Sequence, residues 1–155
     1  MLTLKFPFIP VSANKTQKLA SRGKKVVRYN SKEYLTFKEH IHFYLRRKVE
    51  YAVLEQLEAL LKAPHMVFIT IASPSVLKKD GTTHKTFGDS DNFVKPLLDS
   101  VYKYFGANDC YATIPVPNKT VSDSTYTQVS WLPFKSWKKK DFVLVDHIRD
   151  VVEGL

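Results

Sequence analysis

The chain has 155 residues, 44% of them hydrophobic, which is enough apolar material for one core rather than two. Its formal net charge of +9 favours a polyanionic partner, and nucleic acid is the leading class. No apolar run approaches the ~18 residues of a membrane span and the N-terminus lacks a signal-peptide pattern, so we expect a cytoplasmic protein with no membrane partner. Cys110 is the single cysteine, which excludes an internal disulfide, and we expect its side chain to be buried as a small hydrophobe.

The N-terminal segment predicts a strand followed by a basic hairpin or loop. Residues 2–8 alternate apolar and polar side chains until prolines interrupt them. No acid occurs from residue 15 to residue 32, and residues 25–29 could form a second strand with its cations on one face. Such a block repels itself unless an anion lies against it, so we predict nucleic-acid contacts there. The predicted contacts are Lys15, Lys18, Arg22, Lys24, Lys25 and Arg28.

The middle of the chain predicts a long helix and a central strand. Ser31 suits the N-cap of a helix that would run to residue 63, because its apolar residues keep three-to-four spacing. Pro64 would end that helix. Residues 65–72 form a β-branched run typical of a strand buried on both faces, and residues 73–88 form a polar loop.

A second helix is predicted over residues 92–105, where apolar residues again follow helical spacing. Pro96 suits only the first turn of a helix, which suggests a start near Val94. Lys95, Asp99 and Lys103 form a ladder at four-residue spacing.

Two further strands, about residues 112–121 and 125–132, would pair as a hairpin, and Pro115 and Pro117 push the first toward a sheet edge. This order of elements predicts an α+β domain with a small mixed sheet and helices on one side. We take residues 1–132 as that domain and 133–155 as a C-terminal extension packed on it.

Aspartates dominate the acidic residues between positions 59 and 122, and three of them suggest a metal site. Asp89 and Asp91 are two apart and can share an ion, and Asp109 would join them if the chain returns to the same edge. Mg²⁺ takes few protein carboxylates and accepts phosphate oxygens. Helix capping explains Asp89 and Asp91 equally well, and Lys95 is either a ladder residue or a cation directed at a phosphate.

The run Asp89-Ser90-Asp91-Asn92, continuing through Lys95 and Asp99 and followed by Asp109, resembles the motif of the RusA family of Holliday-junction resolvases. The opening at residues 7–14 also resembles that family. The family often has two adjacent acids at the late position, where this chain has Asn108 and Asp109.

The resemblance implies a homodimeric, bacterial or phage-encoded endodeoxyribonuclease. Such an enzyme resolves four-way DNA junctions by paired nicks in recombination and repair, with Mg²⁺ as cofactor and Mn²⁺ as a substitute. Asp89, Asp91 and Asp109 would bind the metal, and Lys95 would be the catalytic lysine. Lys119 would contact phosphate. The alternatives are a non-catalytic module that binds branched nucleic acid and a less selective flap or fork nuclease.

Overall fold

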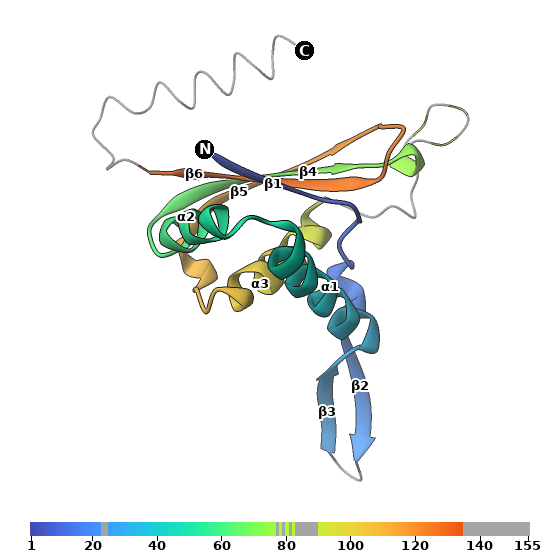
Figure 1. Cartoon of the computed structure of the whole chain (residues 1–155). Coiled ribbons are helices and arrows are strands. Elements are labelled where there is room, and N and C mark those ends of the chain that lie inside the picture. Colours follow the sequence, from blue (N-terminus) through green and yellow to red (C-terminus); the bar gives the residue numbers. More distant parts are fainter. Residues whose placement is uncertain (23–24, 77, 79, 81, 83–89, 135–155) are drawn as a thin grey trace.

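Over the residues that the structure describes, the fold is a mixed α+β arrangement in which three α-helices lie against one face of a four-stranded sheet (Figure 1). The computed structural model describes residues 1–22, 25–76, 78, 80, 82 and 90–134, so most of the predicted extension lies outside the described residues. The predicted α+β class with helices on one side is confirmed. Within the described residues, no helix is both long and apolar enough to cross a bilayer.

The sheet has the strand order β1-β6-β4-β5. Its strands are β1 (Leu2–Phe6), β4 (His65–Ala72), β5 (Ala112–Thr120) and β6 (Tyr126–Pro133). β6 runs antiparallel to both β1 and β4, whereas β4 and β5 are parallel. Most β4 side chains are buried, as predicted for a central strand.

The predicted hairpin of the last two strands is wrong, because β4 lies between β5 and β6. β4 is apolar on both faces and gains most burial from an inner position with a partner on each side. β5 takes the edge, as its prolines predict. Pro115 and Pro117 are two apart, so their missing N–H groups fall on one side of the strand, which at an edge can face away from β4.

The predicted long helix is interrupted. The structure has α1 (Lys32–Lys48) and α2 (Tyr51–Leu61), with extended backbone at Val49 and Glu50. At roughly 100° per residue, an unbroken helix would place Leu57 and Leu61 nearly opposite the buried stripe of α1. The break turns both apolar faces toward the core, where Leu45, Leu57 and Leu61 are fully buried.

The second predicted helix is α3 (Asp91–Tyr104), which begins earlier than Pro96 suggested. Pro96 is the sixth residue, so the helix loses the bond that an N–H at this position would give to the Asn92 carbonyl. The Pro96 ring is buried, and the Ser100 hydroxyl donates to the Pro96 carbonyl at 2.6 Å. Burial of the ring compensates for one missing backbone bond near the start of the helix.

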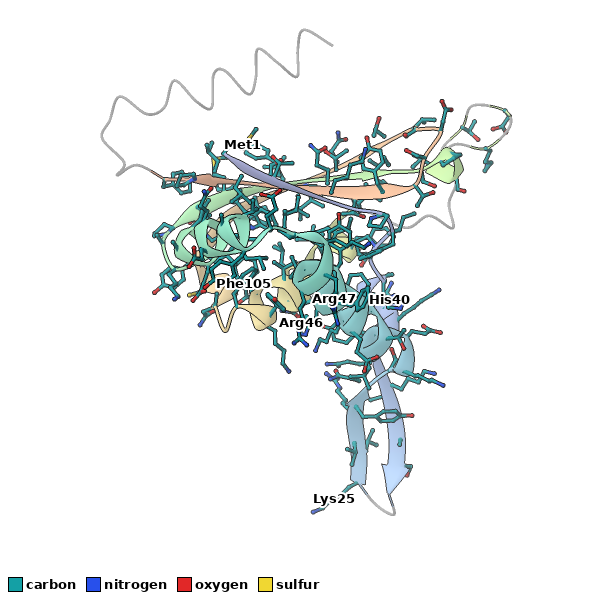
Figure 2. All side chains as sticks on the ribbon, viewed as in Figure 1. Met1, Lys25, His40, Arg46, Arg47 and Phe105 are labelled. Atoms are coloured by element: carbon teal, nitrogen blue, oxygen red, sulfur yellow. The ribbon has the colours of Figure 1, made fainter. Side chains whose placement is uncertain are left out.

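The basic segment forms an antiparallel hairpin, as predicted. Its strands are β2 (Gln17–Arg22) and β3 (Lys25–Asn30), and they project away from the sheet and helices (Figure 1). Figure 2 labels Lys25 near the tip of this arm. The prediction that β3 carries its cations on one face is wrong. Lys25 and Arg28 are three apart and fall on opposite faces of an alternating strand.

The arm joins the domain through the short helix η1 (Ala13–Lys15) and through Ser31. The Ser31 side chain accepts from the Tyr34 backbone N–H at 3.1 Å, which confirms the predicted N-cap of α1. Its hydroxyl also donates to the Lys15 carbonyl, and its backbone N–H donates to the Thr16 carbonyl at 2.8 Å. One buried serine therefore both starts α1 and closes the base of the arm.

Candidate functional site

One face of α3 carries charges at four-residue intervals. Asp91, Lys95, Asp99 and Lys103 follow this spacing and share a helix face. The Lys95 Nζ donates to Asp99 Oδ1 at 3.1 Å, so the first rung of the predicted ladder is present. No ion pair joins Asp99 to Lys103 among the described residues. Lys95 and Asp99 form the centre of the candidate site.

The chain reverses after α3 and brings Asp109 back to Lys95. Gly106 adopts a positive φ of 62°, and the Ala107 N–H donates to the Tyr102 carbonyl at 3.0 Å, which ends the helix in a left-handed turn. Asp109 then begins the short helix η4 (Asp109–Tyr111), which the Asn108 side chain caps. Asp109 Oδ2 lies 3.8 Å from the Lys95 Nζ. The chain therefore brings Asp109 back to the Lys95 position of α3, without a partner chain.

These groups line an open cleft of about 660 Å³ between α1, α3 and the turn that follows α3. The hydrogen bond and charge of Asp99, and to a lesser extent those of Asp109, raise the pKa of Lys95. Lys95 thus stays protonated over the ordinary pH range. The cleft is lined by Tyr34, Lys38, Lys95, Asp99, Tyr102, Lys103, Gly106, Ala107, Asn108 and Asp109.

Two tyrosines in the cleft wall were not predicted from the sequence. Burial raises the pKa of Tyr34, and the nearby Asp99 raises it further. Burial also raises the pKa of Tyr102. His65 Nδ1 donates to the Ala63 carbonyl at 2.6 Å, so Nε2 of the neutral ring is an acceptor and the Tyr102 hydroxyl donates to it. Both are ordinary core aromatics in their helices, and only the packing of α1 on α3 identifies them as cleft residues.

Asp91 is exposed at the start of α3, and its Oδ1 accepts from the Asn92 backbone N–H at 2.9 Å. Asp89 lies outside the described residues. Within those residues no group of three His, Cys, Asp or Glu side chains could hold a metal ion. Magnesium commonly uses only one or two protein carboxylates together with substrate phosphates, and the exposed oxygens of Asp91 and Asp109 suit this hard cation. Carboxylate oxygens are the donor type that Mg²⁺ prefers, and Asp91 and Asp109 are exposed carboxylates among the described residues that could supply them.

The predicted nucleic-acid contacts fall in two separate parts of the fold. Lys15 is exposed at the base of the arm, and the exposed residues Lys18, Lys25 and Arg28 lie along it. Arg22 is the last residue of β2, and Lys24 lies outside the described residues. Lys119 is half-buried on the edge strand β5, away from the arm.

Cys110 follows Asp109 and is exposed, so the prediction of a buried cysteine is wrong. It falls in the turn that returns the chain toward β5, where its side chain is not packed into the core.

No protein-family model matches the chain, and no curated protein is significantly similar to it.

Proposed function

We propose that the chain is a Mg²⁺-dependent endonuclease that cuts branched DNA, with a RusA-like fold and a four-way junction as its substrate. One observation carries the proposal: Lys95 lies within 4 Å of the carboxylates of both Asp99 and Asp109 in an open, charged cleft. These are three of the positions in the motif that resembles the RusA family. Spacing accounts for the contact with Asp99, whereas the contact with Asp109 requires the chain reversal at Gly106.

Lys95 supplies positive charge at the reacting phosphate. Its raised pKa keeps the side chain cationic, and its salt-bridge partners hold it at the cleft. A fixed cation aimed at developing negative charge is worth about 10²–10³ in rate when a comparable donor is removed from other enzymes. Asp99 positions Lys95 and does not itself touch the phosphate.

Asp91 and Asp109 would bind Mg²⁺ together with Asp89. When bound, this ion lowers the pKa of water and neutralises charge on the phosphate oxygens. Asp109 also contacts Lys95, at 3.8 Å, and so connects the metal-binding carboxylates to the catalytic lysine. Asp91→Asn would weaken metal binding and leave the cleft in place, because Asp91 does not line it.

The basic arm supplies the DNA-binding surface. Lys18, Lys25 and Arg28 are exposed on the hairpin of β2 and β3, which projects away from the domain (Figure 1), and η1 at the base of the arm packs on α3. Contacts of this kind fix the position of a duplex without reading its sequence, so branch recognition depends on shape. Affinity should fall steeply as salt is added.

We also propose that two copies act together. A four-way junction needs two symmetric nicks, and a two-fold dimer would present one cleft to each strand. Light scattering coupled to size-exclusion chromatography, with and without junction, tests this state.

A non-catalytic binding module is the second candidate, and the hydrogen bond between Asp91 Oδ1 and the Asn92 N–H favours it. In that case Asp91 only stabilises the start of α3. The deciding experiment incubates labelled four-way junction, fork and linear duplex with the chain, with and without Mg²⁺. We expect Mg²⁺-dependent paired nicks in the junction. Cutting of fork and junction at equal rates would indicate the less selective nuclease, and intact DNA throughout would indicate the binding module.

A further inference from the structure

A pair of lysines forms a second charged group in the same cleft. Lys38 comes from α1 and Lys103 from the last turn of α3, and both line the cleft that holds Lys95. The Lys38 Nζ lies 4.3 Å from the centre of the Tyr34 ring. The Tyr34 ring therefore holds the Lys38 ammonium at the cleft wall.

This pair has no carboxylate of its own. Lys95 contacts both carboxylates of the cleft, whereas neither Lys38 nor Lys103 forms an ion pair with any residue that the structure describes. Burial, and then repulsion from Lys103, lower the pKa of Lys38, and the charge of Asp99 opposes this effect in part. Lys38 is partly buried and Lys103 is exposed, and their like charges repel each other. An anion between them would relieve that repulsion.

We propose that Lys38 and Lys103 bind a backbone phosphate of nucleic acid, adjacent to the phosphate that Lys95 contacts. The inference rests on the proposed function in one respect, namely that a strand enters this cleft. The site is open and carries three lysines against two aspartates, which suits an extended polyanion better than an enclosed apolar ligand. Lysine contacts phosphate as a point charge and reads no sequence.

Binding measured as a function of salt tests this proposal without any need for cleavage. All variants carry Asp91→Asn to prevent cutting, and fluorescence anisotropy of a labelled four-way junction gives the dissociation constant at several salt concentrations. The variants are Lys38→Gln, Lys103→Gln and the double substitution. Lys62→Gln is the control. It removes the same charge from an exposed lysine that pairs with Glu58 and lies outside the cleft.

We expect the slope of log affinity against log salt to fall in magnitude by roughly 0.7–0.9 for each lysine removed. The Lys62→Gln control should keep the slope of the parent. An unchanged slope in the double variant would overturn the phosphate site, and so would an equal change in the control.

The two proposals can fail separately. If the Asp91-containing parent cuts no DNA but the slopes fall as expected, the nuclease proposal fails and the phosphate site stands. If that parent cuts junctions and the slopes do not change, only the phosphate site fails. A chain that binds no DNA at all would contradict both.

Discussion

Replacing Ser31 with alanine should weaken both the domain and the attachment of its arm. Ser31 is fully buried, caps α1 by accepting from the Tyr34 N–H, and donates to the Lys15 carbonyl at the base of the arm. Alanine removes both side-chain bonds and leaves the backbone bond from residue 31 to Thr16 intact.

The two losses have separate magnitudes. Loss of an N-cap side chain costs about 0.5–2 kcal/mol, and a carbonyl left without its donor costs about 1–3 kcal/mol. If they add, the free energy of unfolding falls by roughly 1.5–5 kcal/mol. For a chain of this size each kcal/mol shifts Tm by about 2–4 °C, so Tm should fall by roughly 3–20 °C.

Urea unfolding gives the free energy, and amide hydrogen exchange resolves the local effect. An isolated two-stranded hairpin is marginally stable in water, so the amides of β2 and β3 should exchange faster in Ser31→Ala by a larger factor than those of β4. Thr36→Ala is the matched control, because it removes an exposed hydroxyl from the second turn of the same helix. A Ser31→Ala loss below about 0.5 kcal/mol, or hairpin exchange equal to that of the parent, would refute the reasoning.

Three further predictions concern the core and the cleft. Burial lowers the pKa of His65 below its ordinary value of 6.5. The neutral imidazole therefore contributes its full stability above pH 6.5, and the free energy of unfolding falls as the pH drops below 6.5, by up to about 1.4 kcal/mol per pH unit. Urea unfolding at several pH values should show this slope, and an equal slope in His65→Gln would assign it to another group. Gly106→Ala should cost about 1–2 kcal/mol by strain alone, because nothing lies within 4 Å of an added Cβ, and should also reduce junction cleavage by displacing Asp109. Gly106→Asn should retain more of the stability and more of the junction cleavage than Gly106→Ala. Equal results for the two variants would contradict this. Lys95→Gln should change stability by less than about 1 kcal/mol, because its ion pairs are exposed. Its single-turnover cleavage should fall by about 10²–10³, and a rate near that of the parent would remove Lys95 from the mechanism.

Local patterns predicted the elements that depend on neighbouring residues. The Ser31 cap, the buried strand β4 and the pair of Lys95 with Asp99 all depend on spacing within one segment. The break between α1 and α2 was not predictable in this way, because three-to-four spacing continues across Val49 and Glu50. Only the need to bury both apolar faces against one sheet decides it.

Long-range contacts account for the remaining differences. The partners of β5 and β6 depend on β4, which precedes both strands in the sequence and lies between them in the sheet. The cleft also depends on long-range contacts, because Tyr34 and Lys38 line the same cleft as Asp109 only through the packing of α1 on α3. The return of Asp109 had one local signal in Gly106, since glycine is common at the left-handed end of a helix.

The most direct test of the proposed nuclease compares Asp91→Asn with the parent chain on a labelled four-way junction in Mg²⁺. Asp123→Asn is the matched control, because it makes the same change at an exposed aspartate between β5 and β6. We predict that the parent and Asp123→Asn nick the junction, and that Asp91→Asn binds the junction and leaves it uncut. Cleavage by Asp91→Asn at the parent rate, or an intact junction with the parent chain, would contradict the account.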